Sequence, residues 1–297
     1  MTTQKWLYSL FFSTFSLVTG IAQAQETQPE YEKIADVIYG KIGDRELLLD
    51  VYLPATATTA TPPLLVWVHG GAWRGGTKDR VMILDFINDG YAIASLDFRL
   101  SGEGMFPAQV HDIKAAIRFV RAKAEFYGYD AENIALLGSS SGGHLVSLVG
   151  VTNGNKELEG DIGDFVDESS DVQAIVSYFG ASNLTTILSQ STPHGLNVRK
   201  PALDLFIGGQ PEESVELAKQ ASPIFHIDRS DPPLLLLHGD QDPQMPINQS
   251  HELHHAYQQQ GLDVAFEVVH GAAHGGPEFV DEQRNTVVLD FLNNHLK

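Results

Sequence analysis

The chain has 297 residues, contains no cysteine and carries 38 acidic against 19 basic side chains, a formal net charge of −19. This length exceeds the roughly 100–200 residues of a typical domain, but α/β folds often form one unit of this size. The absence of cysteine excludes disulfides, a thiol nucleophile and cysteine-bound zinc. The negative charge repels the phosphates of nucleic acid and of anionic membranes, so neither is an expected partner.

The first 24 residues have the features of a secretory signal peptide. Lys5 precedes an apolar stretch over Trp6–Ile21, and Ala22-Gln23-Ala24 forms a small-x-small cleavage site. A membrane anchor is the alternative, but polar residues interrupt this stretch, and it is shorter than the ~20 apolar residues that a span requires. We therefore expect cleavage after Ala24 and a periplasmic or secreted mature domain over residues 25–297, not held in the membrane.

Short apolar runs alternate with amphipathic stretches along the rest of the chain. Most of these runs are continuously apolar, as expected of strands in a parallel sheet with both faces covered. The predicted strands are residues 47–53, taken as an edge strand, 63–70, 91–98, 133–138, 172–180, 232–239 and 264–271. The predicted helices are residues 79–89, 107–127, 142–150, 248–260 and 278–296. This alternation predicts a doubly wound, mostly parallel α/β sheet.

Two segments depart from this alternation. Residues 153–171 are acidic and glycine-rich, which predicts a surface excursion. Residues 181–231 lie between two predicted strands and are much longer than one crossover requires. We expect them to hold additional helices over the C-terminal edge of the sheet, as a small lid insertion.

Three consecutive serines, Ser139 to Ser141, stand between Gly138 and Gly142, where a predicted strand ends and a predicted helix begins. This arrangement matches the G-x-S-x-G nucleophile elbow, in which the middle residue occupies a strained turn. Taken alone, the five residues also fit a turn that only caps a helix. In the strand-turn-helix context, Ser140 is the predicted nucleophile.

A serine hydroxyl needs a base, and His274 is the predicted one. In this motif class the acid and then the histidine follow the serine along the chain. His274 lies among small residues after the last predicted strand, where an imidazole has room to reach Ser140. His270, still on that strand, is the second candidate. His69 and His238, which end strands before glycines, are expected to brace loops instead.

The orienting acid is expected after the strand 232–239, where Asp240 and Asp242 follow one another closely. Asp242 stands farther from the strand end and precedes Pro243, so its side chain is better placed to reach the far nitrogen of His274. Asp240 is expected to hold the turn. Asp242 is therefore the predicted third member of the triad.

Acyl transfer also requires N–H groups directed at the developing oxyanion, and a glycine-rich turn exposes them. The sequence HGGAWRGG follows the strand 63–70. Gly71 and Ala72 are the predicted donors, together with the N–H of Ser141. Next to them, Trp73 and Arg74 could equally contact substrate or pack against the lid.

Taken together, the motifs HGGAWRGG, GSSSGGHL, HGDQDPQMP and GAAHGG resemble the α/β-hydrolases of the bacterial feruloyl-esterase type, relatives of the hormone-sensitive-lipase-like esterases. The resemblance covers residues 33–296. It implies a serine carboxylesterase that acts on acetyl or feruloyl esters, often of plant polysaccharides, with Ser140, Asp242 and His274 as its triad. No metal or other cofactor is expected. The chain departs from the family pattern at Ser141, where alanine is usual, and at Ala72, where many relatives have glycine.

Other functions remain open at this point. A serine peptidase of the prolyl-oligopeptidase type could use the same triad, but no propeller domain precedes it. A binding protein on a hydrolase scaffold would ordinarily lack a triad member. The stretch HELHH (251–255) matches a zinc-protease signature, yet His251 and His255 are expected on the solvent side of their helix. The predicted partner is a small-molecule or polysaccharide ester.

Three further polar residues could be mistaken for members of the site. Asp97 and Arg99 follow the strand 91–98, and Asp112 lies on the helix that comes next. We expect them to form a structural network beside the sheet.

Overall fold

The computed structural model describes residue 1 and residues 31–55 and 61–297. The predicted signal peptide therefore lies, apart from Met1, outside the described residues, as does its cleavage site. Within the described ranges, no helix combines the length and the apolar character needed to cross a membrane.

The described residues form an eight-stranded sheet in the order β1-β2-β4-β3-β5-β6-β7-β8. Its strands are β1 (Tyr31–Ile42), β2 (Arg45–Pro54), β3 (Pro63–Val68), β4 (Ala92–Leu96), β5 (Asp130–Ser139), β6 (Ala174–Tyr178), β7 (Leu234–Gly239) and β8 (Val264–Val269). All neighbours from β4 to β8 in the sheet pair in parallel, while β1 pairs antiparallel with β2, and β2 pairs antiparallel with β4. The prediction of a mostly parallel α/β sheet is confirmed.

One strand position was predicted wrongly. The run 47–53 was expected to be an edge strand, but β2 lies between β1 and β4. The edge is β1, which the sequence analysis did not predict. Half of the residues of β1 are exposed, and the strand is held by pairing along nearly the whole length of β2.

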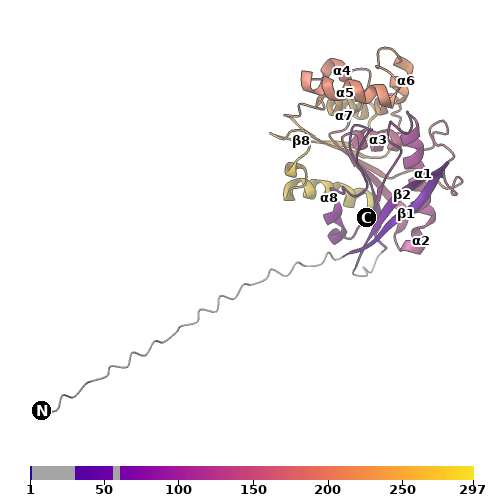
Figure 1. Ribbon diagram of the computed structural model, residues 1–297, viewed down its shortest axis with the longest axis vertical. Coiled ribbons are helices and arrows are strands. Elements are labelled where there is room, and N and C mark those ends of the chain that lie inside the picture. Colours follow the sequence, from indigo (N-terminus) through magenta and orange to yellow (C-terminus); the bar gives the residue numbers. More distant parts are fainter. Residues whose placement is uncertain (2–30, 56–60) are drawn as a thin grey trace.

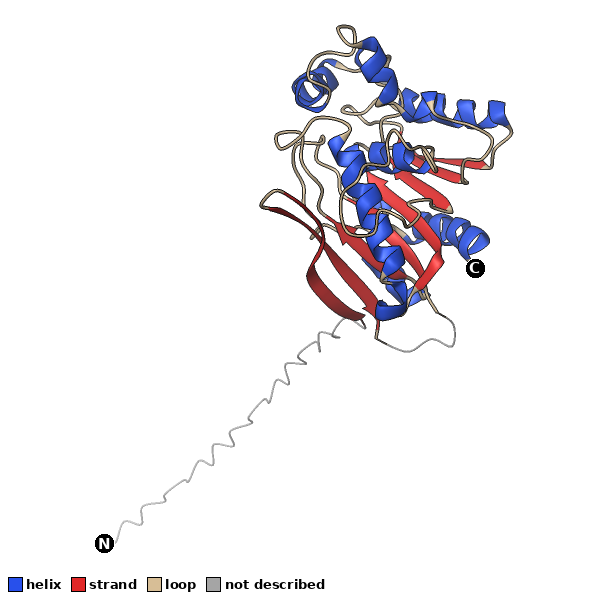
Figure 2. Ribbon diagram, turned by 90° about the vertical axis from the view of Figure 1, so that its right-hand side faces the viewer, coloured by secondary structure: helices blue, strands red, loops and turns tan. Residues whose placement is uncertain are grey.

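Helices cover both faces of the sheet (Figures 1 and 2). One apolar core lies beneath α1, α3 and α7, and a second lies beneath η1 and α8. These elements are α1 (Ala108–Ala122), α3 (Ser141–Gly150), α7 (Asn248–Gln260), α8 (Glu282–Leu296) and the 3₁₀ helix η1 (Leu84–Asp89). The short α2 (Ala124–Tyr127) continues α1. Of the helix predicted over 79–89, only the 3₁₀ helix η1 is present. Its buried residues are Phe86 and Ile87.

The segment 181–231 contains three helices, which Figure 1 shows beyond the end of the sheet. They are α4 (Ile187–Gln190), α5 (Pro193–Phe206) and α6 (Val215–Gln220), followed by the 3₁₀ turn η2 (Pro223–Phe225). The remaining turn, η3 (Pro277–Phe279), precedes α8. The additional helices are thus present as predicted. That they act as a lid over the site stays a prediction.

The acidic segment 153–171 is more than a solvated excursion. Glu159 forms ion pairs with Lys114 and Arg118, whose side chains are buried in α1. Leu158 and Ile162 on either side are buried as well. The segment is therefore fastened to α1 by charge pairing and apolar contact.

Candidate active site

Ser140 occupies the turn between β5 and α3. Its backbone has φ 54° and ψ −117°, a conformation that a non-glycine residue rarely adopts. The Ser140 N–H donates to the Tyr178 carbonyl oxygen over 2.8 Å, which ties the turn to the neighbouring strand β6. This strained turn directs the Ser140 hydroxyl away from the sheet and toward the loops.

The two glycines that flank the serines are required by close packing. A Cβ atom at Gly138 would lie 2.6 Å from the Gly142 oxygen, and one at Gly142 would lie 2.1 Å from the Val68 oxygen. Both distances are shorter than any real contact of a Cβ atom. The strand, the turn and the helix can therefore approach this closely only with glycine at both positions.

His274 connects Ser140 with Asp242. The Ser140 hydroxyl donates to His274 Nε2 over 2.8 Å, and His274 Nδ1 donates to Asp242 Oδ2 over 2.6 Å. The loop after β8 carries His274, and the loop after β7 carries Asp242. The structure thus brings together the three predicted residues from positions 140, 242 and 274.

The carboxylate of Asp242 is buried and fully engaged. Its Oδ1 accepts from the N–H groups of Gln244 and Met245, each over 2.8 Å, and its Oδ2 also faces His238 Nε2 at 3.4 Å. Burial alone would raise the pKa of Asp242, but hydrogen bonds from His238 and His274 outweigh it and hold that pKa well below its usual range. Asp242 is therefore ionised at neutral pH and keeps the proton of His274 on Nδ1.

Phe179 packs against His274, a contact that was not predicted from the sequence. Its ring packs edge-on against the imidazole, with ring centroids 4.8 Å apart, and against Phe279 at 4.7 Å. Its φ of 42° is unusual for a bulky residue. Burial by such neighbours lowers the pKa of His274, although Asp242 opposes the shift.

The predicted oxyanion turn follows β3. Gly71, Ala72 and Trp73 all have positive φ, at 132°, 54° and 59°. The N–H groups of Gly71, Ala72 and Ser141 have no hydrogen-bond acceptor among the residues that the structure describes. Such N–H groups, on the loop after β3 and at the start of α3, are what stabilisation of an oxyanion requires.

The side chain of Trp73, a residue of this turn, packs against the lid segment. It is fully buried, stacks on Phe206 with ring centroids 4.7 Å apart, and donates from Nε1 to His144 Nδ1 over 3.1 Å. His144 Nε2 in turn donates to the Ala221 carbonyl oxygen over 2.6 Å. Burial lowers the pKa of His144 to about 4, so this histidine is a neutral link between the turn, α3 and the lid segment. Of the two interpretations of Trp73, lid packing is the one observed.

The two residues weighed as second candidates pair with each other instead. His270 Nδ1 lies 2.8 Å from Asp240 Oδ2, and the His270 side chain is 82% exposed. His238 braces a loop as predicted, since it contacts the Ser250 hydroxyl at 2.7 Å and the Met245 oxygen at 3.0 Å.

The zinc-like stretch lies on α7 with its two outer histidines exposed. Leu253 and Tyr257 are buried, while His251 and His255 face solvent, as predicted. The described part of the chain contains no group of three or more potential metal ligands.

The network of Asp97, Arg99 and Asp112 is structural, as predicted. Arg99 donates to both carboxylate oxygens of Asp112 over 2.7 to 3.1 Å. Asp97 accepts from the Lys78 N–H over 2.8 Å. The Arg99–Asp112 bonds fix the loop after β4 to α1, and the Asp97 bond ties the same loop to the segment after β3.

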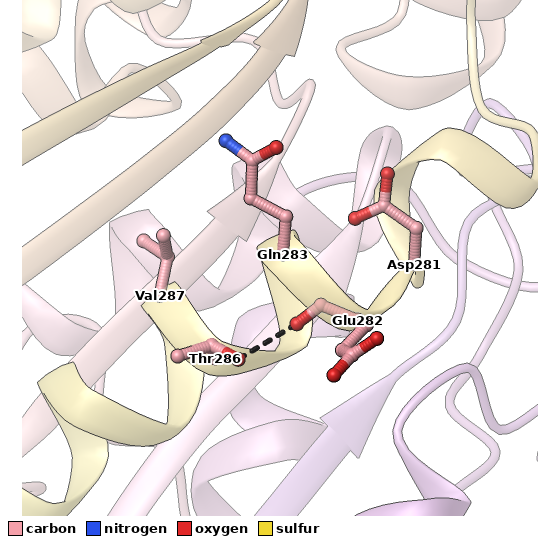
Figure 3. Close-up of a pocket in the computed structure, with 5 residues that line it drawn as sticks. All are labelled: Asp281, Glu282, Gln283, Thr286 and Val287. Atoms are coloured by element: carbon pink, nitrogen blue, oxygen red, sulfur yellow. Dashed lines mark hydrogen bonds between the residues drawn. The ribbon is translucent and has the colours of Figure 1, made fainter.

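A surface hollow also lies over the first turns of α8 (Figure 3). Its lining residues are Asp281, Glu282, Gln283, Thr286 and Val287. None of them belongs to the Ser140 site, and Thr286 only donates to the Glu282 carbonyl oxygen of its own helix.

The Ser141 hydroxyl has a testable effect on stability. It is buried with no hydrogen-bond partner among the described residues. We expect Ser141→Ala to raise the free energy of unfolding by about 1 kcal/mol, because an unpaired buried hydroxyl is destabilising. Urea denaturation measures this. Ser147→Ala on the same helix is the matched control and should lower stability, because the Ser147 hydroxyl donates to the Gly143 oxygen over 2.8 Å.

Comparison with known proteins identifies the family. A match to the BD-FAE family covers residues 49–257. The chain belongs to the BD-FAE family. The resemblance drawn from the motifs is therefore confirmed, as is the α/β-hydrolase fold. The probable carboxylic ester hydrolase LipM of Mycobacterium tuberculosis is 30% identical over 226 residues, 74% of this chain and 51% of that protein. Esterase LipC of the same organism is 30% identical over 217 residues, 72% of this chain and 52% of that protein. This BD-FAE chain spans about half the length of these curated relatives.

Solved structures similar to this BD-FAE chain include carbohydrate esterases. A truncated form of a carbohydrate esterase from gut microbiota has a TM-score of 0.82 and 31% identity, and the match covers 90% of this chain and 98% of that one. A bifunctional GH43-CE protein of Bacteroides eggerthii has a TM-score of 0.79 and 34% identity, over 88% of this chain and 38% of that one.

Proposed function

We propose that this protein is a serine carboxylesterase that hydrolyses short-chain acyl or feruloyl esters of carbohydrates through an acyl-enzyme. The observation that carries the proposal is the continuous chain of hydrogen bonds from Ser140 through His274 to Asp242. The N–H groups of Gly71, Ala72 and Ser141, which have no acceptor within the described ranges, complete the arrangement. The similarity of this chain to solved carbohydrate esterase structures supports the proposed substrate class.

In the proposed mechanism, the Ser140 hydroxyl attacks the ester carbonyl carbon while His274 Nε2 takes its proton. Asp242 holds the imidazolium through Nδ1, and the N–H groups of Gly71, Ala72 and Ser141 stabilise the oxyanion. His274 then gives the proton to the leaving alcohol, which leaves the acyl group on Ser140. Water, activated by the same imidazole, attacks the acyl-enzyme and releases the acid.

The pH profile follows from the environment of His274. Because burial lowers the pKa of His274, its neutral, basic form persists below the ordinary value of about 6.5. We expect kcat/KM for a neutral ester to be constant above about pH 6.5 and to fall as the pH drops through the lowered pKa. A half-maximal point above pH 7 would contradict the assignment. His270→Asn, which changes only the exposed histidine, is the control and should give the same profile.

Acyl length is the second expectation. The large apolar side chains exposed on the segment 181–231, Leu205, Val215 and Phe225, lie on three separate elements, α5, α6 and η2. Each additional methylene of an acyl chain gains ~0.8 kcal/mol only where an apolar surface receives it. On a panel of 4-nitrophenyl esters, kcat/KM should therefore fall from acetyl or butyryl toward decanoyl. A preference for ten or more carbons would favour a lipase.

Active-site labelling tests the proposed function directly. A fluorophosphonate should modify Ser140, detected by mass spectrometry of the intact chain and its peptides, and should abolish hydrolysis of acetylated xylan and methyl ferulate. A chelator should leave activity unchanged. Activity that is lost to chelator and restored by zinc would instead support a metal mechanism at residues 251–255.

We also propose that residues 1–24 direct the protein to the periplasm or the exterior, with the hydrolase domain starting at residue 25. Amino-terminal sequencing of the protein exported by the native host would test the cleavage after Ala24.

A further inference from the structure

Helix α5 of the lid segment carries a buried arginine, Arg199. The inward face of α5 has residues at helical spacing, namely Gly195, Arg199, Ala202, Leu203 and Phe206. Arg199 is fully buried, and none of its three guanidinium nitrogens has a hydrogen-bond partner within the described part of the chain. Burial lowers the pKa of Arg199 to about 10, so the group remains charged at neutral pH. A buried charge that has lost its hydration and gained no hydrogen bond is strongly unfavourable, which points to a missing anionic partner.

The position of α5 places this charge beside the catalytic groups. At the beginning of α5, the Thr192 hydroxyl donates to the Pro243 oxygen over 2.5 Å, next to the triad acid. At its end, Phe206 stacks on Trp73 of the oxyanion turn. Arg199 lies between these two anchors, with Cζ 5.9 Å from the centroid of the Trp73 ring. Its guanidinium therefore lies beside the Trp73 ring of the oxyanion turn, close enough to Asp242 and His274 for their charges to interact.

The electrostatics of the site agree with this position. Burial is the main cause of the lowered pKa of His274, and the charge of Arg199 adds to it. The charge of Asp242 raises the pKa of Arg199, whereas the charge of Arg74, an exposed residue of the oxyanion turn, lowers it. Two guanidinium groups thus lie near the site in a chain whose net charge is −19.

We propose that Arg199 binds a carboxylate of the substrate, so that the enzyme selects esters with an acidic group close to the ester bond. The inference rests on the proposed esterase function. A guanidinium binds a carboxylate through two parallel hydrogen bonds, which would satisfy nitrogens that are now unpaired. The carboxylate can belong to the alcohol, as in an esterified uronic acid, or to the acyl group, as in the half-ester of a dicarboxylic acid.

Two matched substrate pairs test this selectivity and distinguish the sources of the carboxylate. The alcohol pair is an O-acetylated methyl glucuronide against the corresponding O-acetylated methyl glucoside. The acyl pair is 4-methylumbelliferyl hemiglutarate against 4-methylumbelliferyl valerate. In one pair, we expect the wild type to favour the acidic ester by roughly ten- to a hundredfold in kcat/KM. Arg199→Met should bring this ratio to about one, and Arg199→Lys should retain part of it.

A binding measurement separates this inference from catalysis. The full-length Ser140→Ala variant cannot form an acyl-enzyme, so calorimetry with D-glucuronate and with glutarate, against D-glucose, reports binding alone. We expect the anion that belongs to the preferred pair to bind, and Arg199→Met in the same background to weaken it at least tenfold. If binding depends on Arg199 but the wild-type protein hydrolyses no ester, the proposed esterase function is refuted and the carboxylate site is retained.

A purely structural role for Arg199 makes the opposite prediction for stability. If the guanidinium served only to pack on Trp73, Arg199→Met would lower Tm. If it awaits a ligand, the same change should raise Tm of the unliganded protein, because it removes an unpaired buried charge. Wild-type hydrolysis of both esters of each pair at equal rates would overturn the carboxylate site and leave the esterase standing. This comparison uses the wild type alone, so it does not depend on whether the Arg199→Met variant folds. Ratios unchanged by Arg199→Met would overturn the carboxylate site as well.

Discussion

Replacing Ser140 by alanine is expected to lower kcat/KM for an acetyl ester by on the order of 10⁴-fold or more while the fold is retained. The side-chain oxygen is the proposed nucleophile, and its bond to His274 Nε2 is the first link of the proton relay. Steady-state kinetics together with circular dichroism measure activity and fold in the same preparations. The variant should also fail to react with a fluorophosphonate.

The two neighbouring serines provide the controls for this experiment. Ser139→Ala and Ser141→Ala change side chains that have no bond to His274, and both keep their backbone N–H groups. Each should cost far less than Ser140→Ala. Equal losses at all three positions would mean that the nucleophile has been assigned to the wrong serine.

Replacing Asp242 by asparagine is expected to lower kcat by on the order of 10³–10⁴-fold, an effect of the size found for the same change in other triads. An amide can present its N–H₂ to His274 Nδ1, and this favours the tautomer that carries the proton on Nε2, facing Ser140. Such an imidazole cannot accept the serine proton. The loss should be smaller at high pH, where hydroxide can assist, so kcat is measured across the pH range.

Asp240→Asn is the matched control for the triad acid. Asp240 lies two residues away, pairs with the exposed His270 and has no contact with His274. Activity of this variant should stay close to that of the wild type. A larger loss for Asp240→Asn than for Asp242→Asn would transfer the orienting role to the Asp240–His270 pair.

The local parts of the site were predictable because each depends on a few consecutive residues. The elbow around Ser140 follows from glycines that permit close packing, at the end of a continuously apolar strand. The positions of His274 and Asp242 follow from the rule that parallel strands end at the same edge of a sheet, where their loops converge. These relations hold in any doubly wound sheet.

Other features depend on contacts that local sequence does not encode. Half of the residues of β1 are exposed and only two are buried, so its strand conformation comes from pairing with β2. The segment 79–89 has the pattern of a helix, but only Leu84–Asp89 becomes helical, as the 3₁₀ helix η1. In both cases the preference of the segment is weak, so the neighbour decides the outcome.

By itself, the sequence determined the α/β class, the succession along the chain of the seven strands after β1 and the identity of the three residues that meet at the site. Only the tertiary structure decided that Phe179 packs against His274, that Trp73 joins the oxyanion turn to the lid segment, and that Arg199 faces inward with no hydrogen-bond partner among the described residues. The reason is physical. Strand and turn preferences act over a few residues, whereas the burial of a side chain in the lid segment depends on how α5 docks on loops far away in the chain.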